Sequence, residues 1–211
     1  MLNLTAFDPS NDNELLQGSY NQIKRKDCLE IVTQRSEQDE VLMKIKFALT
    51  IPQSATISIQ NLFRITLPNG KFYIAQCLFN IGFSANSRRL KMHEYNFQIV
   101  GLADLSVDLG RTQMRPETRA DKIVGRLLLG NDIDLAETKH FNDKYYLVSD
   151  KPSIIARHFD KEFVNTISKY DNLMLVTCNK EMCISFDTDF EIDHSGIVED
   201  IFSHCRFLAP I

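Results

Sequence analysis

The sequence predicts an α+β fold, in which an N-terminal antiparallel β-rich domain, either an open sheet or a small barrel, precedes a C-terminal α+β unit. In that unit we expect helices on one face of a small antiparallel sheet. Two observations carry the prediction. Apolar and polar residues alternate in short runs as far as about residue 102, and beyond it apolar residues recur every three to four positions, as in helices. We therefore expect a polar tail over residues 1–22, a β-rich domain over 23–104 and an α+β domain over 105–211.

Five or six short strands are predicted in the first domain, with no helix between them. Val41–Phe47 alternates apolar and basic residues from Met43 onward, which is the pattern of a strand with one solvent-facing side. The other predicted strands are Ala55–Ile59, Asn61–Leu67, Phe72–Phe79 and Glu94–Leu102. A hairpin is predicted at Leu67-Pro68-Asn69-Gly70, because Pro68 presets φ and Gly70 can adopt the left-handed conformation of a G1 bulge.

A helix is predicted from about Pro116 to Leu129. Proline suits a first helical turn, where its missing N–H costs nothing, and Gly130 ends the helix. A basic stripe lies roughly opposite the apolar face of this helix and consists of Arg115, Arg119, Lys122 and Arg126. A solvent-facing stripe is the simpler interpretation. The alternative is a surface that binds anionic lipid headgroups or an acidic partner.

The C-terminal unit begins with the apolar strand Tyr145–Val148. Pro152 predicts the first turn of a helix capped by Ser149 or Asp150, and Asp160 is expected to cap the next helix. Two strands of a hairpin follow, at Leu173–Thr177 and Met182–Phe186. The last helix is expected to start near Ser195 and to bury Ile197, Val198, Ile201, Phe202 and Cys205.

Three stretches of the second half resemble a family of uncharacterised bacterial proteins. They are Arg115-Pro116-Glu117, then Gly130-Asn131-Asp132-Ile133-Asp134-Leu135, then Phe141-Asn142-Asp143-Lys144-Tyr145-Tyr146-Leu147. A helix that begins near Phe159-Asp160-Lys161-Glu162-Phe163 completes the pattern, and the resemblance covers roughly Leu109–Phe202. Members of that family are often tethered to a membrane by N-terminal spanning helices, and no activity is established for them. This sequence has no apolar run of the length that a spanning helix needs.

Carboxylates alternate with apolar residues between residues 187 and 193. Asp187, Asp189, Glu191 and Asp193 could hold a hard cation through their oxygens. The sixth position of a calcium loop, however, would be Ile192, where glycine is required for the sharp turn. Solvated acids that protect a strand edge are the simpler interpretation.

Cys178 and Cys183 flank the turn of the predicted C-terminal hairpin and are a second candidate metal site. Joined by His158, His194, His204 or Cys205, they could form a tetrahedral zinc set. No second cysteine or histidine pair has the tight spacing of a zinc knuckle, so buried thiols are the simpler interpretation.

The composition indicates a soluble protein of the cytoplasm. The net charge is -4, which disfavours bulk nucleic-acid binding, and the 44% apolar fraction suits an ordinary core. The N-terminus lacks the pattern of a signal peptide, and five scattered cysteines suggest reduced thiols.

We find neither a nucleophile elbow nor a phosphate-binding glycine loop nor a helical metal-ligand motif. The sequence therefore favours a non-catalytic protein without a cofactor that binds a protein partner or forms a homo-oligomer. The first alternative is a metal-assisted or small-ligand enzyme that uses the 187–193 carboxylates and nearby histidines. The second is peripheral association with an anionic membrane through Arg115, Arg119, Lys122 and Arg126.

Overall fold

The computed structural model describes residues 29–49, 55–67, 70–84, 91–118, 133, 135, 139–186 and 194–209. Of residues 81–84 and 91–95 only the backbone is described. The predicted tail over residues 1–22 lies outside these ranges.

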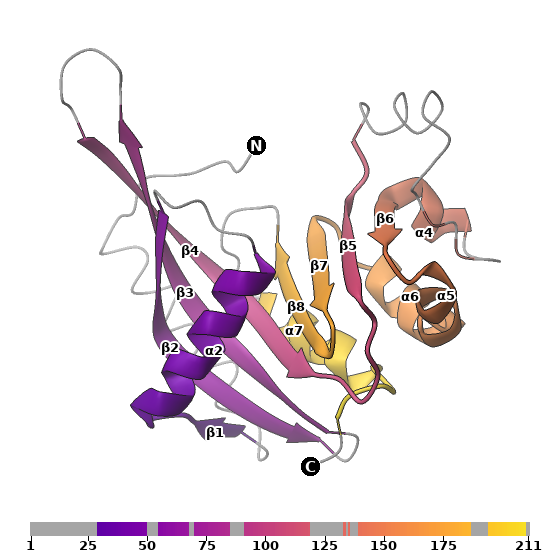
Figure 1. The fold of residues 1–211 in the computed structure, drawn as a ribbon, viewed down its shortest axis with the longest axis horizontal. Helices are drawn as coiled ribbons and strands as arrows, with labels where there is room; N and C mark the ends of the chain where they lie inside the picture. Colours follow the sequence, from indigo (N-terminus) through magenta and orange to yellow (C-terminus); the bar gives the residue numbers. More distant parts are fainter. Residues whose placement is uncertain are drawn as a thin grey trace.

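One eight-stranded antiparallel sheet runs through the molecule in the order β1-β2-β3-β4-β8-β7-β5-β6 (Figure 1). The strands are β1 (Leu29–Ile31), β2 (Ala55–Leu67), β3 (Gly70–Ser84), β4 (Lys91–Asp104), β5 (Arg111–Pro116), β6 (Tyr145–Ser149), β7 (Leu173–Cys178) and β8 (Glu181–Phe186). The sheet is open, so the α+β fold is confirmed in its open-sheet form. The proposed boundary at residue 104 falls between β4 and β5, and β4 pairs with β8 across it.

The predicted hairpin joins β2 to β3, and Leu67 pairs with Gly70. Residues 68 and 69 lie outside the described ranges, so the turn type is not described. Gly70 has φ +149°, and a Cβ there would lie 2.6 Å from the carbonyl oxygen of Ala209. Glycine is therefore required both by the backbone conformation and by the close approach of the C-terminal segment. The two strands predicted at Ala55–Ile59 and Asn61–Leu67 are one strand with a bulge between Ile59 and Asn61.

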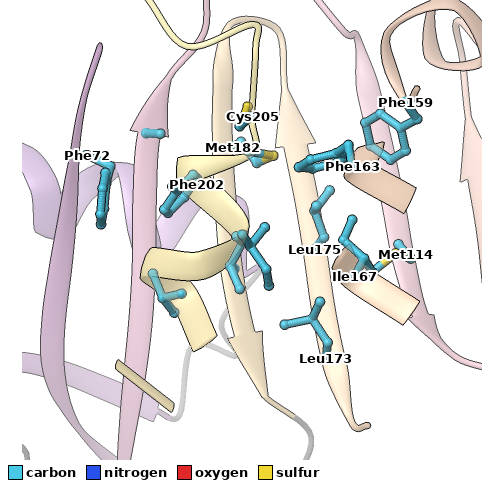
Figure 2. Packing of buried hydrophobic residues seen from close by; sticks show 14 of the residues in the cluster. Phe72, Met114, Phe159, Phe163, Ile167, Leu173, Leu175, Met182, Phe202 and Cys205 are labelled. Atoms are coloured by element: carbon cyan, nitrogen blue, oxygen red, sulfur yellow. The ribbon is translucent and has the colours of Figure 1, made fainter. Parts of the chain in front are cut away.

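Helices cover both faces of the sheet. α2 (Arg35–Ala48) packs on one face, where its buried side chains meet Leu62, Ala75 and Val100. The opposite face carries α4 (Lys139–Lys144), α5 (Pro152–His158), α6 (Lys161–Ser168) and α7 (His194–Ser203), whose side chains share the larger core. Figure 2 shows this packing at α6 and α7. The helices of the C-terminal unit therefore do lie on one face, as predicted.

The strand predicted at Val41–Phe47 is wrong, because these residues belong to α2. Val41, Ile45 and Ala48 are buried at positions i, i+4 and i+7, which is one face of a helix. Met43 and Phe47, the residues that made the run look alternating, are each 65% exposed. Both periods fit this short window, and packing on the sheet selects the helical one.

The predicted helix does not begin at Pro116, because Arg111–Pro116 is strand β5. Met114 is fully buried between Leu147 of β6 and Leu175 of β7, its partners in the two ladders. Pro116 ends the strand, where its missing N–H costs the ladder little. Residues 119–132, which hold the rest of the predicted helix, lie outside the described ranges.

Most other C-terminal predictions are confirmed. Asp160 caps α6, since its Oδ1 accepts a hydrogen bond from the Phe163 N–H at 2.9 Å. Pro152 begins α5, but its N-cap is Lys151, not Ser149 or Asp150. The Ser149 hydroxyl instead accepts a hydrogen bond from the Lys151 N–H at 3.0 Å.

Candidate functional site

A cleft of about 1080 Å³ opens on the α2 face of the sheet, beyond the C-terminal end of α2. In Figure 1, α2 crosses β2–β4, and it leaves the strands β7, β5 and β6 to its side. The residues that line the cleft are Ala48, Leu49, Arg111, Thr112, Gln113, Ile133, Tyr146, Val148, Ser149, Asp150, Pro152, Met174 and Val176. The cleft is thus the part of the sheet that α2 does not cover.

The floor of the cleft follows from the register of three strands. Gln113 is opposite Val148 of β6 and Val176 of β7, so these three side chains project from the same face. Their neighbours Thr112 and Met114 point to the other face and are fully buried. The alternation along β5 therefore places Arg111 and Gln113 on the cleft face, and Thr112 and Met114 under the helices.

The polar row of β5 consists of the alternate residues Arg111, Gln113 and Arg115. Arg111 and Gln113 are exposed, and Arg115 is half-buried. The Arg115 guanidinium carbon lies 4.9 Å from the centroid of the Tyr146 ring, which is within cation–π distance. No carboxylate among the described residues forms an ion pair with Arg111, so its charge remains available to a ligand.

One rim of the cleft is fixed by backbone contacts around Asp150. Its Oδ1 accepts a hydrogen bond from the Arg111 N–H at 2.8 Å. Gly110 has φ +69°, and a Cβ there would lie 2.0 Å from that same oxygen. Lys151 pairs with Asp108 at 2.7 Å, and this hydrogen bond holds the pKa of the Asp108 carboxyl below its usual range. The Asp150 carboxylate therefore has a structural role, because it holds this rim by accepting the hydrogen bond from the Arg111 backbone.

The outer edge of β6 is occupied next to the cleft. The Ile133 N–H donates to the Leu147 carbonyl at 2.7 Å. Asn142 donates to and accepts from the backbone of Leu135, at 3.1 and 3.2 Å. The first bond places Ile133 beside β6, so a ligand reaches the face of the sheet at this point and not its edge. The other two bonds join Leu135 to α4.

A second hollow, of about 350 Å³, lies between α2 and the sheet and is filled by charge pairs. Glu37 accepts hydrogen bonds from Arg64 at 2.9 Å and from the Tyr73 hydroxyl at 2.8 Å. Burial, together with the bond to Glu37, raises the pKa of Tyr73 to about 12. Because each of these side chains already has a partner, the network anchors α2 and does not form a ligand site.

A cluster of Asp200, Ser203 and His204 at the end of α7 has the residue types of a hydrolase triad but not its geometry. The Ser203 hydroxyl donates to the Asp200 carbonyl at 2.7 Å. The Nδ1 atom of His204 lies 2.8 Å from that carbonyl and 3.1 Å from the hydroxyl. A triad needs serine and carboxylate on opposite ring nitrogens. The side chains of Ser203 and His204 therefore cap the C-terminal end of α7 and do not form a catalytic triad with Asp200.

The cysteines and histidines that we considered for zinc lie on two faces of the sheet. Cys178 pairs with Glu181, and Cys183 pairs with Val176, so the two thiols are diagonal neighbours on the α2 face. On the other face, the ring of His194, the first residue of α7, stacks on Phe186 at 3.8 Å. Cys205 is buried in the core of that face, and His204 directly follows α7. Within the described residues, no three side chains of histidine, cysteine, aspartate or glutamate converge on a possible metal position.

The structure describes only some of the remaining candidate residues. Asp187, Asp189, Glu191 and Asp193 lie outside the described residues, as do Arg119, Lys122 and Arg126. Arg115, the first member of the predicted basic stripe, is on strand β5, where its guanidinium lies over the Tyr146 ring, and it is not among the residues that line the cleft. The sequence did not predict the cleft. The alternation Arg111-Thr112-Gln113-Met114-Arg115 is a two-sided pattern that could have indicated strand β5, but not the opening beside α2.

None of the helices in the described part of the chain is both long enough and apolar enough to span a bilayer. No protein-family model matches the sequence, and no curated protein matches it. Among solved structures, the chain is similar to the crystal structure of the mycobacterial trehalose monomycolate transport factor A, with a TM-score of 0.44 and 9% identity. That similarity covers 97% of this chain and 99% of the other, and it is too low to transfer a function.

Proposed function

We propose that the protein is a non-catalytic binding protein, and that a segment of a protein partner occupies the cleft over β5, β6 and β7. The observation that supports this most is a sheet face that α2 leaves open, in which Val148, Val176 and Tyr146 surround the polar row of β5. Apolar side chains on an uncovered sheet face mark an interaction surface.

The size and openness of the cleft favour a peptide over a small ligand. Pockets for small molecules typically hold about 300–1000 Å³ and enclose most of the ligand. This cleft has about 1080 Å³, just above the upper end of that range, and it opens on the face of the sheet. Among the described lining residues, the Thr112 hydroxyl donates a hydrogen bond to the Ser149 hydroxyl at 2.7 Å, and neither hydroxyl is paired with a base. Binding is therefore the better interpretation of this site than catalysis.

Homo-oligomerisation is a second candidate, supported by α2. Met43 and Phe47 are four residues apart on its outer face and are each 65% exposed. Large exposed side chains at this spacing form a continuous strip. Analytical ultracentrifugation tests this candidate: a dimer that dissociates in Met43→Glu/Phe47→Glu supports it, and a monomeric wild type at high concentration removes it.

We place the protein in the cytoplasm. Four cysteines of the described chain, Cys77, Cys178, Cys183 and Cys205, are free thiols. Unbridged cysteines are usual where the environment is reducing. Fractionation of cells that express the full chain tests the compartment, and recovery outside the cytoplasm would contradict it.

Site-specific photo-cross-linking tests the proposed function. A photoreactive phenylalanine derivative replaces Gln113 in the cleft floor or, as a control, the exposed Thr56 on β2. In extracts of the source organism we expect one reproducible protein partner from position 113 and not from position 56. The purified partner should then bind the wild type and lose affinity for Val148→Lys. Identical cross-links from both positions, or unchanged binding by Val148→Lys, would contradict the proposal.

A further inference from the structure

We infer that the protein self-associates through an edge of its sheet. The segment Ala55–Asn61 of β2 pairs antiparallel with the same segment of a second copy, across a two-fold axis at Ser58. This inference goes beyond the proposed function, because β2 lies towards the opposite end of the sheet from the cleft over β5, β6 and β7. It also uses a different surface from the strip on α2.

The outer edge of β2 is paired over only part of its length. β1 pairs with β2 from Phe63 to Ile65, and the Val32 N–H then donates to the Leu62 carbonyl at 2.9 Å. Among the strands that the structure describes, none pairs with the outer edge of Ala55–Asn61. Alternate backbone N–H and C=O groups of this segment are therefore available to another strand.

The segment lacks the usual features that protect a strand edge. Natural edges are protected by charged side chains, by proline or by a bulge that twists the edge away. Ala55–Asn61 contains neither a charged residue nor a proline. Its bulge, between Ile59 and Asn61, lies at the end next to β1 and leaves the rest of the segment regular. A second strand can therefore pair with this edge without burying a charge.

The length of the segment determines the register of the pair. β2 begins at Ala55, and β1 and Val32 occupy the outer edge from Leu62 onward, so residues 55–61 are open. Two antiparallel copies of this segment overlap over its whole length only if Ser58 faces itself on the two-fold axis. Any other register leaves part of the open edge unpaired.

The side chains are self-complementary in that register, as a two-fold interface requires. On one side of the strand Thr56 faces Gln60 of the second copy, and all three polar residues of this row, with Ser58, are exposed. The Gln60 Nε2 atom donates to the Ser58 hydroxyl at 3.0 Å, so these two side chains share that side. On the α2 side, Ile57 faces Ile59. The second copy thus brings polar groups to polar groups and isoleucine to isoleucine, with no like charges opposed.

Sedimentation velocity of the full chain over a concentration series tests the inference. We expect a weak monomer–dimer equilibrium, because a contact one strand wide buries little surface. Ser58→Lys and Ser58→Glu should each raise the dimer dissociation constant at least about threefold, since each opposes like charges on the axis. An equimolar mixture of the two variants should dimerise again. Thr66→Glu, at an exposed position of β2 outside the paired segment, should dimerise as the wild type does. So should Met43→Glu/Phe47→Glu, which alters only the α2 strip.

Disulfide trapping tests the register. In a Cys28→Ser/Cys178→Ser background, the remaining cysteines are buried. There Ser58→Cys should form a covalent dimer with a mild oxidant and Thr66→Cys should not, because directly opposite residues have Cβ atoms only about 4.5–5.5 Å apart.

A monomeric wild type at every concentration would overturn the inference and leave the edge to a different partner. A dimer that neither Ser58 charge variant weakens, or equal trapping at positions 58 and 66, would also overturn it. None of these results decides the proposed function, since the cleft partner is captured from position 113. Position 56, which lies in the paired segment, should capture a second copy of the chain and not that partner.

Discussion

Gly101 of β4 lies directly under Val198 of α7. A Cβ at Gly101 would lie 2.5 Å from the Val198 Cγ1 atom and 2.9 Å from the Phe202 ring. Phe202 in turn packs against Phe72 of β3, with ring centroids 4.8 Å apart (Figure 2). The absence of a side chain at Gly101 thus lets α7 approach the centre of the sheet, opposite the face that α2 covers.

We expect Gly101→Ala to lower the free energy of unfolding by about 1–3 kcal/mol, because the added methyl group overpacks the contact with α7. Urea denaturation measures the loss. In a Val198→Ala background the same change should cost about 1 kcal/mol less, since the atom that it strikes is gone. Strictly additive losses would show that the two residues are not in contact.

Asp160→Ala should destabilise the protein by about 0.5–2 kcal/mol, because the Phe163 N–H loses its acceptor at the start of α6. Asp160→Asn keeps a capping oxygen and is the matched control. Both variants lose the exposed ion pair with Arg206, so the difference between them isolates the cap. Equal losses in the two variants would contradict the capping role.

In a Cys28→Ser background, the remaining cysteines should differ in the rate at which they react with a thiol reagent. Burial raises the pKa of the Cys183 and Cys205 thiols to about 12, and it raises that of Cys77 as well. Since the thiolate is the reactive form, these three should react slowly with an aromatic disulfide reagent, whereas the half-buried Cys178 reacts first. The fast phase should disappear in Cys178→Ser, and its persistence would contradict the burial pattern.

The contact between α6 and α7 should weaken at alkaline pH. Tyr170 donates a hydrogen bond to Asp200 at 2.5 Å, and burial together with this carboxylate raises the pKa of Tyr170 to about 12. The unfolded state releases the phenol proton at about pH 10, so stability falls as the pH rises from about 10 towards 12. The free energy of unfolding of Tyr170→Phe should fall less over that interval. Parallel pH profiles would contradict this.

The C-terminal elements could be predicted because their signals are local. Asp160 offers a capping carboxylate three residues before the N–H that it binds, and Pro152 occupies the position that suits its fixed φ. Each of these two residues acts on backbone within a few positions of itself, so the sequence alone carries the information.

The predictions were wrong where contacts with residues distant in the sequence determine the secondary structure. Residues 41–47 fit a strand and a helix almost equally, and α2 is selected by contacts with Leu62, Ala75 and Val100. Pro116 resembles a helix start, yet the ladder of β5 with β6 and β7 extends to it. The cleft could not be predicted for the same reason. It exists because α2 ends at Ala48, short of β5 and β6, and no local pattern gives that relationship.

The affinity of the cross-linked partner for a variant with a filled cleft shows whether the partner binds in the cleft. Gln113→Trp places a large ring on the floor of the cleft, and Thr56→Trp places the same ring at an exposed position of β2 outside it. By isothermal titration calorimetry, we expect Gln113→Trp to bind the partner at least about tenfold more weakly and Thr56→Trp to bind it as the wild type does. Equal affinities of all three proteins would show that the partner does not occupy the cleft.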